Sequence, residues 1–344
     1  MTFLHVVLYG IKQMNGERSA ASIYHLLKGK RSSQTLQDAS IYQLSFLFGI
    51  YRRLERQIYD EHIKQMIQDD FLREIEELRY VLTEKGEKEL QDFKFPIHLH
   101  GLKYGEAGDV FWKRLSLLIQ TVSYLQYRVP FLPIQTEHEV TAWTKQFVLK
   151  QACSRDEFRH KLHTECELLL KNLTAEEATV IVYRLSGFNR VGYTHLQIAQ
   201  MLNKDPFAVH LLFLGAIHGM VQILMKEESD YPILAQLLPR TRHVLSLSTQ
   251  KTYELWKQGK TMEQIANIRS LKLNTIEDHI VEIATYSPDF PIDSFLSQET
   301  IANIQKALQQ TDSRTLRILK QYLPHVSYFH IRLVMAYLGG KYES

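Results

Sequence analysis

Apolar residues recur three and four positions apart along most of the chain, while glycine and proline are sparse. This spacing places one face of a helix towards a core. The stretches "SAASIYHLLKG" (19–29) and "TLQDASIYQLSFLFG" (35–49) each predict a helix that ends on a glycine, as a C-cap requires. The pattern as a whole predicts a mainly α protein built from several helical modules.

Residues 71–90, "FLREIEELRYVLTEKGEKEL", depart from the helical pattern. The first half alternates around "EEL" in the manner of a short β-hairpin, and Thr83 then begins a helix as its N-cap. Helices followed by a two-stranded hairpin predict a winged helix in residues 1–95. A generic helical domain with one hairpin fits the same pattern.

The middle of the chain divides into two segments. Residues 96–170 predict a helical connector of two or three helices, interrupted at Pro130 and Pro133. Residues 171–230 predict a helix, a short helix, a tight turn and a long helix, which is the helix-turn-helix order. This second segment resembles the DNA-binding region of sigma factors.

Helix starts in 171–230 are marked by polar caps. Thr174 with Glu177 and Thr194 with Gln197 each predict a capping box, and Asp205-Pro206 begins the long helix. The long helix carries no lysine or arginine before residue 226. We therefore expect it to lie in a core or on a partner-binding surface rather than to read DNA.

Residues 244–344 form the last segment, in which three capped helices predict a second helix-turn-helix. Gly259 ends the helix of "STQKTYELWKQG" (248–259). Thr261 with Gln264 predicts a capping box for the next helix, and Asn274 with Glu277 predicts one for the helix after it.

Gly259-Lys260-Thr261 also matches the end of a nucleotide-binding loop. Such a loop needs a glycine five residues before the Gly-Lys pair, where this chain has Glu254. The similar stretch beginning at Gly29 has Tyr24 in that place. We reject both as phosphate-binding loops, and no cofactor is predicted.

The last segment resembles a known family. "GKTMEQIANIRSLKLNTIEDHI" (259–280) and "LKQYLPHVSYFHIRLVMAYL" (319–338) are similar to the helicase helix-turn-helix domain, found at the C-terminus of some RecQ-type DNA helicases and in free-standing YpbB-like proteins of Firmicutes. Length, organisation and "SIYHLLKGKRSSQTLQDA" (22–39) extend the resemblance to the YpbB-like proteins over the whole chain. It implies a non-catalytic accessory factor of a RecQ-family DNA helicase, in DNA repair or recombination.

Charge gives limited support for DNA contact. The net charge is only +3, and the residues from 239 onward hold 13 Lys and Arg against 10 Asp and Glu. In the helix at the recognition position, Asp278 and Glu282 would repel phosphates, so base reading is disfavoured. We expect contact mainly with the backbone of single-stranded or forked DNA. A solvated charged surface is the alternative meaning of these residues.

The predicted DNA-contacting residues lie in the first and last segments. They are Lys30, Arg31, Arg52, Arg53, Lys260, Arg269, Lys272, Asn274, Thr275, His279, Arg314, Arg317 and Lys320, with Lys28 and Arg56 beside the first group. Arg314, Arg317 and Lys320 are expected on one face of a helix because they recur three residues apart.

Other functions find less support in the sequence. His160, His163 and Cys166 recur on one helix with Cys153 upstream, yet structural zinc sites draw their ligands as close pairs from turns, so packing is the expected use. Motifs of nucleotide, dinucleotide and hydrolase chemistry are missing, as are those of a helicase motor, and we expect no enzyme. A sequence-specific transcription regulator and a metalloenzyme remain as alternatives. With two cysteines and no long apolar run, a cytoplasmic protein without membrane contact is expected.

Overall fold

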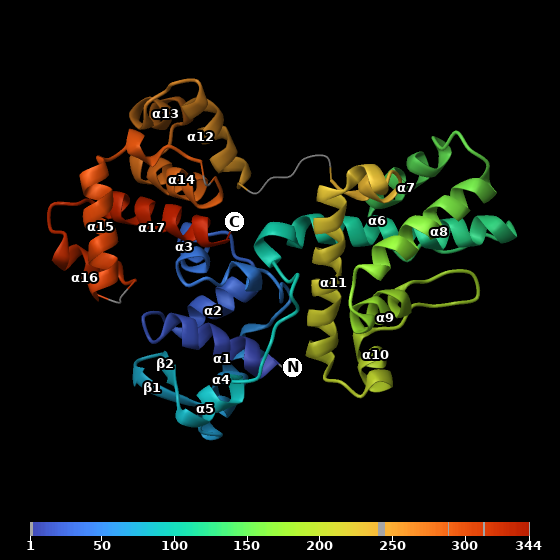
Figure 1. Cartoon of the computed structure of the whole chain (residues 1–344), viewed down its shortest axis with the longest axis horizontal. Coiled ribbons are helices and arrows are strands. Elements are labelled where there is room, and N and C mark those ends of the chain that lie inside the picture. Colours follow the sequence, from blue (N-terminus) through green and yellow to red (C-terminus); the bar gives the residue numbers. More distant parts are fainter. Residues whose placement is uncertain (1–2, 240–244, 288, 312–313, 344) are drawn as a thin grey trace. The chain divides into compact units, whose positions relative to one another are not determined.

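The computed structural model describes residues 3–239, 245–287, 289–311 and 314–343, with side chains described up to Gly339. The chain is mostly helical and carries one small two-stranded antiparallel sheet (Figure 1). The mainly α class predicted from the sequence is confirmed.

The chain forms two compact units. Residues 1–5 and 92–242 make unit 1, and residues 6–91 and 243–344 make unit 2. This division differs from the four segments expected from composition. Residues 6–91 and the residues from 243 onward share unit 2, because helices from both stretches pack together there, and the two middle segments share unit 1.

Unit 1 is a helical unit built around one long apolar helix, α11. Its helices are α6 (Gly101–Tyr127), α7 (His138–Leu149), α8 (Arg155–Lys171), α9 (Ala175–Arg184), α10 (His195–Leu202) and α11 (Pro206–Lys226), followed by the short 3-10 turns η2 (Glu228–Asp230) and η3 (Leu234–Leu237). Helix α11 packs against α6, α9 and α10 (Figure 1). The predicted capping boxes at Thr174 and Thr194 are both confirmed.

Helix α11 corrects one expectation from the sequence. It is long and apolar enough to cross a membrane, although no such run was identified above. In unit 1, 72% of that stretch is buried, and Val209, Ala216 and Val221 have no exposed surface. Of the two uses expected for this helix, the structure therefore supports a place in the core.

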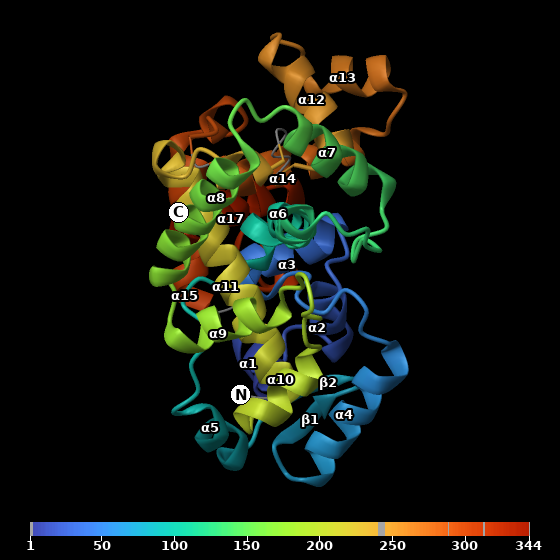
Figure 2. The same cartoon turned by 90° about the vertical axis from the view of Figure 1, so that its right-hand side faces the viewer.

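The N-terminal part of unit 2 contains the predicted hairpin. Its elements are α1 (Phe3–Met14, which begins in unit 1), α2 (Ala20–Leu27), α3 (Ser33–Ile41), the 3-10 turn η1 (Ser45–Leu47), α4 (Arg56–Gln68), β1 (Leu72–Glu76), β2 (Arg79–Leu82) and α5 (Glu84–Leu90). The two strands pair Leu72 with Leu82 and lie beside α4 (Figure 2). Thr83 accepts from the Gly86 N–H and so caps α5 as predicted. The hairpin is confirmed, whereas the winged-helix assignment stays a prediction.

One predicted helix is shorter than expected. The stretch 35–49 was expected to be helical up to Gly49, but α3 ends at Ile41. Gln43 adopts a left-handed backbone conformation with φ of 55°, which stops the helix, and a 3-10 turn follows. Gly49, with φ of +69°, instead turns the chain towards α4.

The C-terminal part of unit 2 contains the predicted helix-turn-helix. Its elements are α12 (Leu247–Lys257), α13 (Met262–Arg269), α14 (Leu273–Tyr286), the 3-10 turn η4 (Ile292–Ser294), α15 (Gln298–Thr311), α16 (Leu316–Tyr322) and α17 (Tyr328–Glu343). Gly259, with φ of +79°, lies just past the end of α12, and Thr261 with Gln264 forms the predicted capping box. Lys260 and Thr261 are therefore a turn and a cap.

The start of α14 differs from the prediction. The helix begins at Leu273, with Lys272 as its N-cap and no side chain capping it. The expected capping box of Asn274 and Glu277 is wrong because Asn274 already lies inside the first turn. The backbone N–H groups of that turn are consequently left without a side-chain acceptor.

Candidate nucleic-acid interface

Helix α14 occupies the recognition position of the helix-turn-helix but is largely covered. It packs against α12, α13 and α17 and against α3 from the N-terminal part of unit 2. Only Leu273 and Asn274 are exposed, and every residue from Thr275 to Tyr286 is buried or half-buried. A helix needs an open face to enter the major groove, so α14 presents only its N-terminal end to a ligand.

The two carboxylates that disfavoured DNA contact are both held within unit 2. Glu282 accepts hydrogen bonds from the Ser246 backbone N–H at 2.7 Å and from the Thr249 hydroxyl at 2.5 Å. Asp278 forms an ion pair with Arg332 at 2.5 Å. Because both carboxylates already have partners within unit 2, the repulsion inferred from the sequence is weaker than expected.

Arg269 and His279, both predicted to contact DNA, join α12, α13 and α14 to one another. The Arg269 guanidinium donates to the Ser248 backbone oxygen at 2.7 Å and lies 2.5 Å from the Thr252 hydroxyl. His279 is 8% exposed, and its Nδ1 lies 2.8 Å from the same hydroxyl. Burial and the nearby Arg269 charge lower the pKa of His279. These side chains are structural here.

Arg314 is likewise engaged within unit 2. It precedes α16, which begins at Leu316, so the predicted helix face of Arg314, Arg317 and Lys320 is wrong for its first member. The Arg314 guanidinium donates to the Ile41 backbone oxygen at the end of α3, and its backbone N–H donates to Glu17 at 3.0 Å. Lys320 donates to the Pro324 backbone oxygen at 2.9 Å. Arg317 is exposed.

Three of the predicted residues remain accessible at the helix-turn-helix. Lys260 is exposed in the turn between α12 and α13, and Lys272 and Asn274 are exposed at the start of α14. Thr275 is half-buried. The uncapped N-terminus of α14 adds the partial positive charge of a helix dipole, which favours a phosphate there.

A close contact between Gly29 and Gly49 joins two basic loops of unit 2. A Cβ atom on Gly29 would lie 2.9 Å from the Gly49 Cα, and both residues have positive φ. Backbone hydrogen bonds hold the loops together: the Gly49 N–H donates to Leu26 O at 2.8 Å, and the Tyr51 N–H donates to Leu27 O at 2.9 Å. The loop after α2 and the loop before α4 are thus adjacent.

These loops carry the N-terminal group of predicted DNA contacts. Lys30, Arg52 and Arg53 are exposed, and within the described residues none of the three pairs with a carboxylate. Arg31 beside them is half-buried. Arg56 pairs with Asp60 at 2.8 Å.

Burial, followed by the charges of Lys30, Arg56 and Lys28, lowers the pKa of His25 in this group. Lysines of the first loop and Arg56 at the start of α4 therefore both act on His25. We call the set Lys28, Lys30, Arg31, Arg52, Arg53 and Arg56 the paired basic loops.

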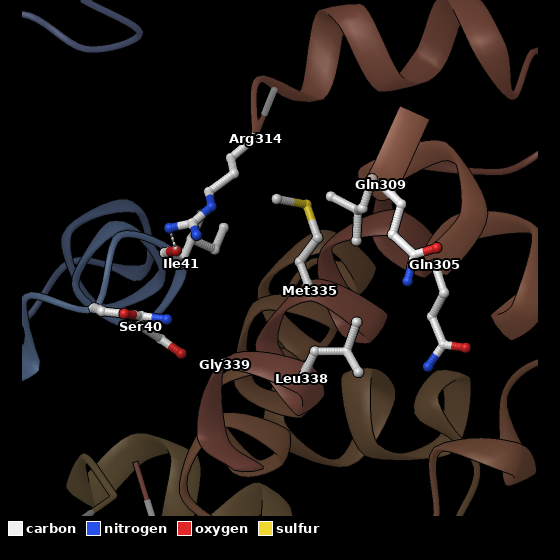
Figure 3. A pocket seen from close by; sticks show the side chains of 10 residues that line it. Ser40, Ile41, Gln305, Gln309, Arg314, Met335, Leu338 and Gly339 are labelled. Atoms are coloured by element: carbon white, nitrogen blue, oxygen red, sulfur yellow. Dashed lines mark hydrogen bonds between the residues drawn. The ribbon is translucent and has the colours of Figure 1, made fainter. Parts of the chain in front are cut away.

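Helix α3, which lies between the two parts of unit 2, was not identified as important from the sequence. Arg332 of α17 donates to Gln37 at 3.0 Å and to Ser33 at 2.8 Å near one end of α3, and Arg314 holds the other end. Arg314 and Ile41 also line a pocket of about 430 Å³, together with Ser40, Gln305, Gln309, Met335 and Leu338 among others (Figure 3). No local signal could have revealed these contacts, because the partners lie almost 300 residues apart.

The histidines and cysteines considered for a metal site do not assemble one. His160 and His163 are exposed on α8, whereas Cys153 and Cys166 pack against the core of unit 1. Burial, with a contribution from Glu165, raises the pKa of Cys166 to about 12, which disfavours the thiolate that a metal needs. Among the residues that the structure describes, no group of three or more potential ligands is placed to hold a metal ion.

Comparisons with known proteins place these features in a family. A helix-turn-helix domain family matches residues 248–335, which run from α12 to the middle of α17, and such a domain suggests DNA binding. No solved structure matches the chain. Protein YpbB of Bacillus subtilis (strain 168) is 33% identical over 347 residues, an alignment that covers 98% of each chain. The chain therefore belongs to the YpbB family.

Proposed function

We propose that this protein binds DNA mainly through the sugar-phosphate backbone and serves as a non-catalytic accessory factor of a RecQ-family DNA helicase, in DNA repair or recombination. The paired basic loops supply the principal contact. The exposed end of α14, with Lys260 and Lys272 in the flanking turns, supplies a second one.

The Gly29–Gly49 contact is the observation that carries this proposal. It brings together cations from two loops that are about 20 residues apart, and three of these cations are exposed and have no carboxylate partner among the described residues. Phosphates neutralised by such cations release counterions, so binding weakens steeply as salt concentration rises.

The burial of α14 favours contact that does not depend on sequence. Base reading in the major groove requires side chains along an exposed helix face, and in α14 only the first two residues are exposed, while the others are buried or half-buried. Phosphate contacts position a protein on DNA without specifying a sequence. The covered helix thus speaks against the alternative of a sequence-specific transcription regulator.

The helicase part of the proposal is supported by the resemblance of residues 259–280 and 319–338 to the helicase helix-turn-helix domain. Since the sequence contains no motor motif, unwinding is assigned to the partner. A non-catalytic factor of this kind is expected in the cytoplasm, where the chromosome of a bacterium lies.

Co-purification tests the helicase part directly. The tagged full-length chain is used to capture a purified RecQ-family helicase, with and without nuclease treatment, and an unrelated helicase serves as the control. After nuclease treatment, we expect the RecQ-family helicase to be retained and the unrelated helicase to be lost. No retention, or equal retention of both helicases, would refute the helicase part of the proposal.

A further inference from the structure

A pair of stacked aromatic rings lies on the surface of unit 1, whereas the C-terminal helix-turn-helix and the paired basic loops belong to unit 2. The rings of Tyr127 and Phe188 are 3.9 Å apart between centroids and inclined by 20°. Tyr127 is the last residue of α6, and Phe188 lies in the turn closed by the bridge between Gly187 and Arg190. Although one face of its ring covers Phe188, Tyr127 remains 51% exposed.

The contact between these two segments is fixed by the backbone as well as by the rings. The Phe188 N–H donates to the Ser123 hydroxyl at 2.9 Å, and a Cβ atom on Gly187 would lie 2.9 Å from that hydroxyl oxygen. Tyr124 packs edge-on against Phe188 from the same helix. The ring of Tyr127 is therefore held in place and presented to solvent on a rigid support.

Each of the two segments carries an exposed arginine, and neither segment contributes a carboxylate. Arg128 follows Tyr127 directly, and Arg190 closes the turn that carries Phe188, where its guanidinium donates to the Val182 backbone oxygen at 3.2 Å and lies over the Tyr183 ring. Residues 110–136 and 178–204 contain no aspartate or glutamate at all. An exposed aromatic ring on two segments that carry arginines and no carboxylate is complementary to a planar base attached to a phosphate.

We infer that Tyr127, with Arg128 and Arg190, forms a binding surface for single-stranded DNA in which an unpaired base stacks on the Tyr127 ring. This inference rests on the proposed function, because it requires that the protein binds DNA. It assigns the contact with single-stranded DNA to unit 1, whereas the contacts proposed above lie in unit 2. Bases within a duplex are already stacked on their neighbours, so their faces are not available to this ring. Stacking on an aromatic side chain is tolerant of sequence.

Anisotropy titrations of the full chain with a labelled oligo(dT) and with a labelled duplex test this assignment. The Tyr127→Ala variant removes the stacking face, Tyr127→Phe retains it, and Tyr322→Ala is the matched control at an exposed tyrosine of unit 2. The expected result is a loss of affinity for oligo(dT) of about 5-fold to 100-fold in Tyr127→Ala, with little change in the other two variants. Affinity for the duplex is expected to stay the same in all three.

Circular dichroism and thermal melting verify that each variant is folded. Photocrosslinking of an iodouracil-containing oligonucleotide gives a second readout, with Tyr127 expected among the crosslinked residues. This inference is overturned if Tyr127→Ala binds oligo(dT) with wild-type affinity, or if the wild-type protein binds the duplex but not oligo(dT). Either result leaves the proposed function standing. If neither DNA binds, both fail.

Discussion

Arg332 of α17 forms an ion pair with Asp278 of α14 at 2.5 Å, and the same guanidinium also binds two residues of α3. One side chain therefore joins three helices drawn from both ends of the chain. It also neutralises a carboxylate that, on the sequence alone, spoke against DNA contact. The helix-turn-helix of this protein is thus integrated into a larger unit.

The Arg332→Ala variant should destabilise unit 2. The Arg332 side chain is only 18% exposed, and its removal leaves the nearly buried Gln37 oxygen without this donor. We expect a loss of about 1–3 kcal/mol in the free energy of unfolding, measured by urea denaturation. Arg332→Lys keeps the charge without the planar guanidinium and should lose less. An unfolding curve of Arg332→Ala identical to that of the wild type would refute the role of this contact.

Gly29→Ala should impair both stability and DNA binding. A side chain at this positive φ of +72° costs about 1–2 kcal/mol, and the new Cβ would also clash with Gly49. Gly259→Ala is the matched control, since its φ is +79° but no atom lies within 4 Å of the added Cβ. We expect Gly29→Ala to lose more stability and to bind DNA more weakly. Equal effects of the two substitutions on stability and DNA affinity would contradict the proposed importance of the Gly29–Gly49 contact.

The stability of unit 1 should decrease as the pH falls below about 6.5. Burial, together with the charges of Arg184 and His210, lowers the pKa of His195 to about 3. Between that value and the ordinary pKa of 6.5, the unfolded chain binds a proton that the folded chain does not. One such group gives a slope of at most about 1.4 kcal/mol per pH unit.

His195→Phe removes this titration while it keeps an aromatic ring against Phe213. Thermal melts between pH 7.5 and 4.5 should show a weaker pH dependence in the variant. The dependence should not vanish, because burial also lowers the pKa of His100, to about 4. An unchanged pH dependence in the variant would contradict this assignment.

Purified protein should contain no stoichiometric zinc. His163 is exposed, whereas Cys166 faces the core with its pKa raised to about 12. His163→Ala should therefore leave the melting temperature unchanged. Elemental analysis of protein purified without chelator measures the metal directly. One zinc per chain, lost in this variant, would instead support the metalloenzyme alternative.

Local features of this fold could be predicted from the sequence, whereas its long-range contacts could not. The capping boxes at Thr174, Thr194 and Thr261 are set by residues three positions apart, and all three are present. The prediction failed at Asn274, where the helix begins earlier, at Leu273.

The candidate site shows the same limit. The sequence indicated which side chains are cationic, but Arg269 and Arg314 bind backbone oxygens that only the folded chain brings near. Likewise, nothing local to residues 29 or 49 indicates that their loops meet.

If the paired basic loops hold the DNA backbone, removing their charges must change the salt dependence of binding. The loop variant carries both Lys30→Glu and Arg53→Glu. The control, called the α8 variant, carries both Lys161→Glu and Lys171→Glu, at two exposed lysines on α8. Duplex affinity is measured for each protein between about 50 and 200 mM salt, a range over which a protein with several phosphate contacts loses orders of magnitude in affinity.

We expect weaker binding for the loop variant at low salt and a logarithmic salt slope that is shallower by about 2, which corresponds to two lost phosphate contacts. The α8 variant should keep the wild-type slope. A wild-type slope in the loop variant, or an equal change in both variants, would show that the paired basic loops do not hold the DNA backbone.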